Sequence, residues 1–243
     1  MSAARFCVEG MALAEGSEAQ LPEAAAHHAT RVLRLAAGDA ITLFDGRGGE
    51  FAARLVRVDK RGARVAIDTF SAIEREAGVA LSLVMSVIAT DAMDIAVRKA
   101  VELGAARIEP VAAARSQGGS QERAARRVEH WQQIVQAACE QCGRNRIPPV
   151  APIVPLDVRL DAADAFDVIL APGAAQSLTQ HAMQAAPRSI IVGPEGGFTD
   201  AELARAARRG VIPVHMGARV LRAETAAIAA LATVIAIAGD AAG

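Results

Sequence analysis

The first seventy residues combine one helical pattern with several short apolar runs. Residues 23–35 place small and apolar side chains at helical spacing, and Gly38 is positioned to end such a helix. The residues on its apolar side are Ala25, Ala29, Val32 and Leu33. Three strand-like runs follow at 40–44, 51–58 and 63–70, and turns that contain glycine separate them. Short strands joined by glycine turns predict a small β-barrel.

From about residue 80 the pattern changes to strands that alternate with helices, which predicts an α/β domain with a mostly parallel sheet. The expected strands are 81–88, 107–112, 167–171, 189–192 and 212–216, and the expected helices are 91–103, 121–142, 176–184 and an apolar C-terminal helix over 225–238. We expect Asp91 to cap the first helix and Gly104 to end it. The charged stretch 71–78 reads as a linker, so the predicted domains are 1–72 and 73–243.

The predicted helix 121–142 has two different faces. One face is an apolar stripe, on which we expect Trp131 to pack into the core: Ala124, Val128, Trp131, Val135, Ala138 and Cys142. The other face carries Arg123, Arg126, Arg127 and His130, and Gly143 ends the helix just before Arg144. These arginines are either a solvated face or a rim that contacts phosphates, and their position around loops favours the rim.

Residues 188–225 contain the pattern that points most directly to a binding site. The apolar strand 189–192 leads into Gly193–Gly197, and Thr199 or Asp200 is placed to cap the following helix, with Glu202 in its first turn. A second strand, 212–216, ends at Gly217. Both loops leave the carboxyl edge of a parallel sheet, which is where ligands bind in open α/β sheets. The alternative is that each glycine loop merely reverses the chain.

The glycine-rich loop does not have the features of a phosphate site. The chain has neither a GxGxxG nor a GxxxxGK[ST] motif, and Pro194 removes one of the N–H groups that a phosphate would need. Glu195 would repel a phosphate, although its carboxylate could accept a hydrogen bond from a ribose hydroxyl. The loop therefore indicates a ligand other than a nucleotide phosphate.

Composition narrows the class of protein further. The chain has 243 residues, 52% of them hydrophobic, and a formal net charge of −1, so it can bury a core and has no global attraction to nucleic acid or membrane. All but two of its 26 basic residues are arginine, which suits forked phosphate contacts. Five basic residues and one acid lie between Arg54 and Arg64, either as a charged edge strand or as an RNA-backbone contact.

We expect a cytoplasmic protein without a metal centre or a membrane span. Cys7, Cys139 and Cys142 make no metal pattern, and His27 and His28 have no ligands at suitable spacing. Charged residues interrupt any signal peptide at the N-terminus, and the apolar run 225–238 is shorter than the roughly 20 residues that cross a bilayer.

Segments spread along the whole chain resemble one known family. HHATRVLRLAAGD and LFDGRGGEF are similar to an N-terminal PUA-like RNA-binding barrel, and MDIAVRKAVELGAARIEP, CEQCGRNRIPP, IVGPEGGF and MGARVLRAETAA to the catalytic domain of the RsmE-type 16S ribosomal RNA uridine-N3 methyltransferases, in the SPOUT superfamily. The resemblance implies a C-terminal trefoil knot, the cofactor S-adenosylmethionine and a homodimer. Two positions depart from the family: Ala92 stands where relatives usually have lysine, and Ala171 where they commonly have histidine.

The resemblance also implies the site residues. Arg144 is the expected catalytic residue that orients uracil and stabilises its developing negative charge, followed by Arg222, with Glu140, Glu195 and Glu224 as candidate bases or orienting groups. The expected cofactor residues are Leu170, Pro172, Val192, Gly193, Pro194, Glu195, Gly196, Gly197, Met216, Gly217, Val220, Leu221, Arg222, Glu224 and Thr225. The expected RNA-binding residues are Arg31, Arg34, Arg115, Arg123, Arg127 and Arg146.

The expected reaction is methylation of uridine N3 in 16S ribosomal RNA, with the small ribosomal subunit as partner. Two alternatives stay open: an enzyme of the same superfamily that methylates a ribose 2′-hydroxyl, and a non-catalytic RNA-binding assembly factor that keeps a cofactor pocket. A protein that binds nucleotide phosphates is disfavoured by Pro194 and Glu195.

Overall fold

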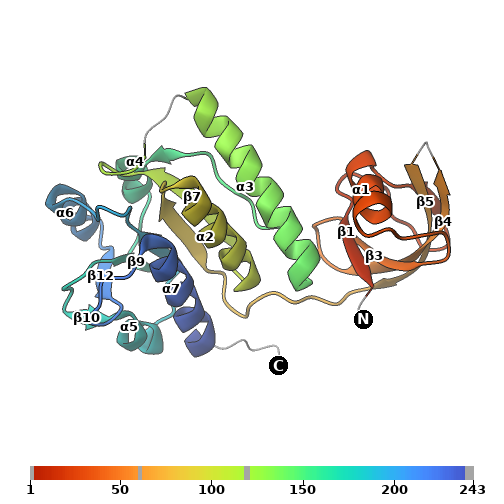
Figure 1. Cartoon of the computed structure of the whole chain (residues 1–243). Helices are drawn as coiled ribbons and strands as arrows, with labels where there is room; N and C mark the ends of the chain where they lie inside the picture. Colours follow the sequence, from red (N-terminus) through yellow and green to blue (C-terminus); the bar gives the residue numbers. More distant parts are fainter. Residues whose placement is uncertain (1–2, 60–61, 118–120, 239–243) are drawn as a thin grey trace. The chain divides into compact units, whose positions relative to one another are not determined.

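A computed structural model describes residues 3–59, 62–117 and 121–238 of the chain (Figure 1). Contacts divide the chain into two compact units. The first unit contains residues 1–76 together with 139–147, and the second contains 77–138 and 148–243. Residues 73–76 and 139–147, which the sequence pattern assigned to the second domain, therefore group with the N-terminal unit.

The first unit is built around a five-stranded sheet in the order β1-β3-β4-β5-β2. Its strands are β1 (Ala4–Cys7), β2 (Glu18–Gln20), β3 (Ala40–Phe44), β4 (Glu50–Asp59) and β5 (Gly62–Ser71). β1 pairs with β3 in parallel, whereas the other pairs are antiparallel. The core of the unit includes Phe6, Ile41, Leu43, Leu55 and Val65, each at most 1% exposed. The predicted small β-domain is confirmed, and β2 is a strand that the pattern did not predict.

The predicted helix over 23–35 is wrong in its second half. The α-helix α1 (Glu23–His27) is followed by a π-helical turn, η1 (His28–Val32), and Arg34 has a left-handed backbone with φ of 57°. The Thr30 hydroxyl donates to the Ala26 carbonyl at 2.8 Å, a bond that favours bending of a helix. The wider turn leaves Val32 and Leu33 60% and 44% exposed, although the helical pattern placed both on the buried side.

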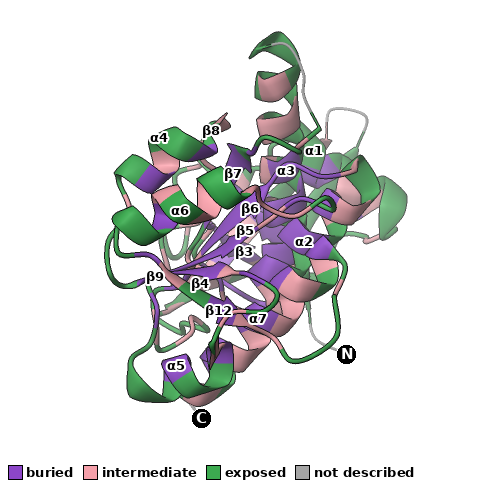
Figure 2. Cartoon of the chain, turned by 90° about the vertical axis from the view of Figure 1, so that its left-hand side faces the viewer, coloured by how far each residue is buried: buried purple, intermediate pink, exposed green. Residues whose placement is uncertain are grey.

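The second unit contains a seven-stranded sheet in the order β10-β12-β9-β11-β6-β7-β8, and its neighbouring strands pair in parallel, as predicted. Figure 2 shows its central strands in the buried colour. The strands are β6 (Ser82–Ser86), β7 (Arg107–Ala112), β8 (Val154–Pro155), β9 (Asp167–Leu170), β10 (Gln176–Ser177), β11 (Ser189–Val192) and β12 (Ile212–His215). The trefoil knot stays a prediction.

Helices cover both faces of this sheet. They are α2 (Thr90–Glu102), α3 (Gln121–Cys142), α4 (Leu156–Asp161), α5 (Leu178–Gln184), α6 (Asp200–Arg208) and α7 (Ala223–Ala238). α7 packs against α2 and α5 on one face, and α4 packs against α6 on a separate core that includes Ile169 and Ile191. Helix α3 has the predicted bounds, and Trp131 on its apolar stripe is 2% exposed. Among the described residues, no helix is long and apolar enough to cross a membrane.

Two helix starts differ in their capping. Thr199 caps α6 as predicted, in a capping box with Glu202. Asp91 does not cap α2, because the helix already begins at Thr90 with Ala89 as its N-cap. Asp91 instead lies in the first turn, where a negative charge is favourable near the helix N-terminus.

A buried ionic network joins the amino ends of the strands to α4. The Arg159 guanidinium donates to Glu109 at 2.5 Å, to Asp167 at 3.0 Å and to the Ser189 hydroxyl at 3.2 Å. The Ser189 hydroxyl in turn donates to Asp167 at 2.6 Å. The network lies on strands β7, β9 and β11, and the pattern gave no prediction for the segment that contains β8 and α4.

Candidate functional site

Three loops leave the carboxyl ends of β12, β9 and β11, which are neighbours in the parallel sheet. The loop after β9 begins at Ala171, the loop after β11 runs from Gly193 to the Thr199 cap, and the loop after β12 runs from Met216 to Arg222. Parallel strands bring the loops at their carboxyl ends to one edge of the sheet. The topology therefore brings together segments that the sequence separates by more than forty residues.

Close packing in the glycine-rich loop requires small residues. A Cβ on Gly193 would lie 3.1 Å from the Phe198 ring, and Gly197 has a φ of +69°, which a side chain disfavours. The Gly197 amide donates to the Pro194 carbonyl at 2.8 Å and closes a tight turn. This turn aims the chain into α6 and leaves Glu195 and Gly196 exposed to solvent.

Three hydrogen bonds tie the glycine-rich loop and the first turn of α6 to the loops after β6 and β7. The Glu195 carboxylate accepts the Ala89 amide at 3.1 Å. The Arg115 guanidinium donates to the Gly196 carbonyl at 2.6 Å, and Glu202 accepts the Ala114 amide at 2.8 Å. Burial raises the pKa of Glu202, but hydrogen bonds from Ala114 and Thr199 lower it more, so the net pKa is below the usual value. Hydrogen bonds to two neighbouring loops therefore fix the position of the glycine-rich loop.

The loop after β12 presents main chain and an apolar side chain to solvent. Gly217 has a φ of +98°, and its amide donates to Nδ1 of His215 at 3.0 Å. Val220 is 83% exposed, and the Arg222 carbonyl accepts the Ala226 amide at the start of α7. An apolar side chain this exposed beside glycine turns suits a ligand with both polar and apolar parts.

Of the predicted site residues, the whole cofactor set lies on this edge of the second unit. Leu170 ends β9 and Pro172 follows it, while Val192 ends β11 and Gly193 to Gly197 follow it. The others follow β12 or begin α7: Met216, Gly217, Val220, Leu221, Arg222, Glu224 and Thr225. The fold thus brings these residues together. Their contact with a cofactor stays a prediction.

Arg144 and Glu140, the two other expected catalytic residues, belong to the first unit. Arg144 is 3% exposed, and its guanidinium forms an ion pair with Glu76, with Nε at 3.1 Å from Oε1. The Glu140 carboxylate accepts the Cys7 amide at 2.9 Å. Glu140 thus has a structural partner, and its proposed role as a base gains no support from this contact.

The predicted RNA-binding arginines fall into two groups. Arg31, Arg34 and Arg146 belong to the first unit and are exposed, and Arg146 pairs with Glu74 at 3.3 Å. Arg115, Arg123 and Arg127 belong to the second unit, where Arg115 already contacts the glycine-rich loop. The RNA contacts of both groups stay a prediction.

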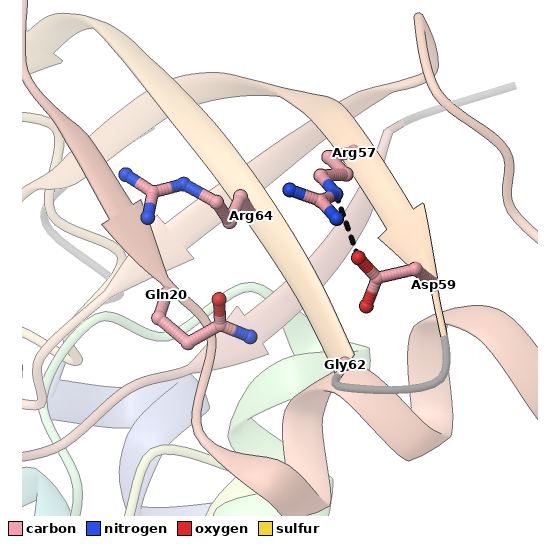
Figure 3. A pocket seen from close by; sticks show the side chains of 5 residues that line it. All are labelled: Gln20, Arg57, Asp59, Gly62 and Arg64. Carbon is pink, nitrogen blue, oxygen red and sulfur yellow. Dashed lines mark ion pairs between the residues drawn. The ribbon is translucent and has the colours of Figure 1, made fainter.

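A shallow groove of about 160 Å³ on the first unit involves part of the basic run (Figure 3). It is lined by Gln20, Arg57, Asp59, Gly62 and Arg64. Arg57 pairs with Asp59 at 2.6 Å and Arg64 with Glu18 at 3.6 Å, while Arg54 forms a forked pair with Asp68 outside the groove. Because each of these arginines has an acidic partner, a solvated surface of ion pairs fits this groove better than an RNA contact. The predicted edge strand is wrong, since β4 and β5 lie between β3 and β2 in the sheet. Lys60 and Arg61 lie outside the described residues.

Sequence reasoning missed the partners of the expected site residues. Glu76, which pairs with Arg144, lies in the stretch interpreted as a linker, and its acidic character was the available signal. Ala89, which donates to Glu195, gave no signal because the contact uses the main chain. Within the described ranges, no group of three or more His, Cys, Asp or Glu side chains could hold a metal ion.

Comparison with known families identifies the domain that contains these three loops. A model described as "RNA methyltransferase domain" matches residues 75–235, and one described as "RNA methyltransferase PUA domain" matches residues 21–68. The chain belongs to this RNA methyltransferase family. The three loops are therefore the carboxyl-edge loops of an RNA methyltransferase domain.

Individual relatives of this RNA methyltransferase are similar to it over most of the chain. A methyltransferase from Legionella pneumophila, solved with the bound cofactor SAM, is 34% identical with a TM-score of 0.92 and covers 97% of this chain and 98% of its own. Ribosomal RNA small subunit methyltransferase E from Neisseria gonorrhoeae, bound to S-adenosyl methionine, is 36% identical with a TM-score of 0.87, over 95% and 96%. A protein of the same name from Synechocystis is 30% identical over 89% of this chain and 72% of its own.

Proposed function

We propose that this RNA methyltransferase transfers a methyl group from S-adenosylmethionine to N3 of a uridine in 16S ribosomal RNA. The observation that carries the proposal is the meeting of three loops at one sheet edge, each with a glycine at positive φ. Relatives that are similar over at least 95% of this chain were solved with S-adenosylmethionine. One of them is named as a small-subunit ribosomal RNA methyltransferase.

The residues of the three loops fit S-adenosylmethionine better than a nucleotide with phosphates. The cofactor carries no phosphate, so the missing amide at Pro194 and the negative charge of Glu195 cost nothing. Gly193 and Gly197 keep the main chain accessible, and Leu170, Val192, Met216 and Leu221 supply apolar surface and backbone groups. We therefore assign adenosine and methionine recognition to the main chain of these loops.

When bound, S-adenosylmethionine supplies an electrophilic methyl group on a sulfonium. The protein must place uracil N3 in line with that methyl and exclude water. N3 carries a proton at neutral pH, which must pass to a base as the methyl group is transferred, and Glu195 and Glu224 are the candidate bases at this sheet edge. A cationic group that stabilises the developing anion lowers the barrier. We assign this role to Arg144, whose guanidinium is held by the ion pair with Glu76. Arg222, on the loop after β12, is the second candidate.

We further propose that the protein works as a homodimer in the cytoplasm and takes RNA in small ribosomal subunits or their late precursors. Arg31, Arg34, Arg123, Arg127 and Arg146 are the RNA contacts that we assign to it. The chain has six Phe, one Trp and no Tyr, so it offers few aromatic side chains for base stacking, which favours a structured RNA over an unstructured one.

Label transfer to separated RNA classes tests the substrate. Purified protein and S-adenosylmethionine carrying a labelled methyl group are incubated with small subunits, large subunits and transfer RNA from cells that lack the gene. Label in 16S ribosomal RNA alone is the expected result. Label in transfer RNA would move the protein to another substrate class, and cofactor binding by calorimetry without any transfer would support an assembly factor.

Arg115→Ala is expected to weaken cofactor binding by about 3- to 10-fold. The substitution removes the hydrogen bond to Gly196, and a lost hydrogen bond costs about 0.5–1.5 kcal/mol, where 1.4 kcal/mol is tenfold in Kd. Calorimetry with S-adenosylmethionine measures the change. Arg126→Ala is the matched control, because Arg126 forms an ion pair with Glu122 in which both side chains are 76% exposed. A raised KM for RNA with unchanged cofactor Kd would make Arg115 an RNA contact instead.

A further inference from the structure

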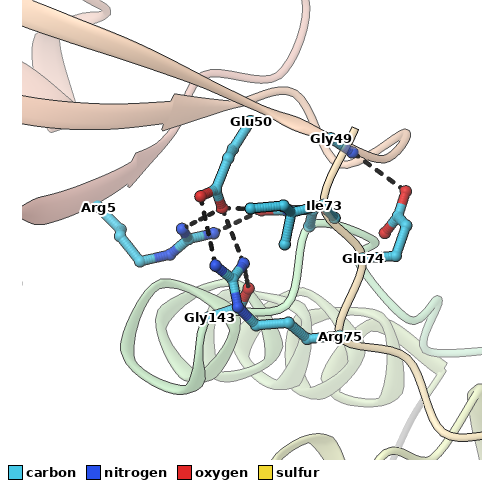
Figure 4. Close-up of polar contacts among 8 residues, drawn as sticks. Arg5, Gly49, Glu50, Ile73, Glu74, Arg75 and Gly143 are labelled. Carbon is cyan, nitrogen blue, oxygen red and sulfur yellow. Dashed lines mark hydrogen bonds and ion pairs between the residues drawn. The ribbon is translucent and has the colours of Figure 1, made fainter. Parts of the chain in front are cut away.

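Glu50, the first residue of β4, is the centre of a polar network within the first unit (Figure 4). Its carboxylate accepts hydrogen bonds from Arg5 at 2.6 Å and from Arg75 at 2.8 and 3.3 Å. It also accepts the Asn145 amide at 3.2 Å. The side chains of Glu50 and Arg5 are only 15% and 12% exposed, so the bond between them is shielded from water, whereas the Arg75 side chain is 40% exposed.

Through Asn145 the network reaches the residue next to Arg144. Asn145 is fully buried, its Oδ1 accepts from Arg5 at 2.5 Å, and its Nδ2 donates to the Ile73 carbonyl at 2.7 Å as well as to Glu50. The side chain of Asn145 therefore has a defined set of donors and acceptors on three segments of the first unit.

Through Arg75 the network reaches the partner of Arg144. Arg75 donates to the Gly143 carbonyl at 2.9 Å while it is held by Glu50. The next residue is Glu76, which forms the ion pair with the Arg144 guanidinium. Glu50 thus holds the neighbour of Arg144 on one segment and the neighbour of Glu76 on the other.

The charges make Glu50 the group on which this arrangement depends. Hydrogen bonds from Arg75, and from Arg5 and Asn145, outweigh burial and lower the pKa of Glu50 to about 2. The carboxylate is therefore ionised throughout the pH range of an enzyme assay. If Glu50 lost its charge, the guanidinium groups of Arg5 and Arg75 would lose the anion that they share.

We propose that Glu50 is a positioning residue for methyl transfer, which holds the Gly143–Arg146 turn so that Arg144 and Glu76 meet in one geometry. The role rests on the proposed function of Arg144. Glu50 touches neither the cofactor loops nor the substrate in this account, so it acts on the rate of transfer and not on cofactor affinity.

The test compares Glu50→Gln, which keeps the shape and removes the charge, with Glu50→Asp, which keeps the charge on a shorter side chain. Glu15→Gln is the matched control, since Glu15 is another carboxylate of the same unit and accepts the Phe70 amide instead of a bond from the network around Glu50. The measurements are kcat and KM on small subunits, cofactor Kd by calorimetry, the melting temperature, and amide hydrogen exchange of the peptide that contains residues 143–146.

Glu50→Gln is expected to lower kcat at least 10-fold and to raise exchange in the 143–146 peptide at least 10-fold, with cofactor Kd within twofold of the wild type. Glu50→Asp is expected to recover part of both effects, and Glu15→Gln to show neither. Unchanged kcat and exchange in Glu50→Gln would overturn the proposal. A parallel fall of kcat, cofactor affinity and melting temperature would overturn it too, because it would indicate general destabilisation.

Hydrogen exchange separates a failure of this proposal from a failure of the proposed function. If the wild-type protein methylates no uridine but exchange in the 143–146 peptide still rises in Glu50→Gln, the proposed function fails and the positioning of the turn by Glu50 stands. If the wild type is active and Glu50→Gln leaves both the rate and the exchange unchanged, the positioning role alone fails.

Discussion

Arg144→Ala is expected to lower kcat for 16S ribosomal RNA by about 100- to 1000-fold, the range measured when one donor that stabilises a developing anion is removed. The substitution deletes the guanidinium that pairs with Glu76 and leaves that carboxylate as a negative charge where the uracil anion would form. Cofactor Kd is expected to stay within about twofold, because the cofactor loops belong to the other unit. Single-turnover kinetics and calorimetry measure the two quantities.

Two further variants show whether the effect belongs to Arg144 itself. Arg144→Lys keeps the charge but loses the fork, so it is expected to recover only a small part of the rate. Arg146→Ala, two residues along, removes an exposed arginine that pairs with Glu74 and is expected to act mainly on KM for RNA. If Arg144→Ala keeps the wild-type kcat, the assignment of Arg144 to the chemical step is wrong.

Arg159→Ala is expected to lower the free energy of unfolding by about 3–5 kcal/mol, because removing one partner of a buried ion pair leaves uncompensated charges. Arg159 bonds Glu109, Asp167 and Ser189 together, and Asp167 is only 4% exposed. Without the guanidinium, the carboxylates of Glu109 on β7 and Asp167 on β9 would lose the cation that bridges them in a poorly hydrated space. Urea unfolding followed by circular dichroism measures the change.

Arg188→Ala is the matched control for Arg159→Ala. Arg188 pairs with Asp164 at 3.1 Å, but the two side chains are 67% and 48% exposed, and exposed pairs contribute about 0–1 kcal/mol. We therefore expect a small change from this variant. A loss below about 1 kcal/mol for Arg159→Ala would show that the network contributes little to stability.

The sequence predicted the parallel sheet well because its strands are short apolar runs that are buried on both faces. β11 (Ser189–Val192) is buried at all four positions, and helix α3 has its expected bounds because its stripe keeps a regular period. The pattern gave nothing for β8 and α4, which together span eight residues and start in a proline-containing segment. Such short elements are formed by tertiary contacts.

The π-helical turn after α1 could not be predicted for a different reason. The spacing of Ala25, Ala29 and Val32 fits a regular helix, and only the hydrogen bonds of the folded chain show the wider turn. A local pattern records which side chains are apolar, but it does not record how the backbone bonds are shared.

The candidate site also has a part that the sequence predicts and a part that it does not. Its glycine loops were predictable because they follow strands in sequence, and the parallel order of β12, β9 and β11 then brings them to one edge. The braces could not be predicted, since Arg115 contacts Gly196 and Glu76 contacts Arg144 across long sequence separations. Side-chain pairing at such distances depends on the fold and leaves no periodic signal.

Identification of the methylated nucleoside tests the central claim most directly. Small subunits from cells that lack the gene are methylated with the purified protein, the 16S ribosomal RNA is digested, and the nucleosides are separated and identified by mass spectrometry. The account predicts 3-methyluridine, absent when Arg144→Ala is used. A ribose-methylated nucleoside in its place, or 3-methyluridine formed equally well by Arg144→Ala, would contradict it.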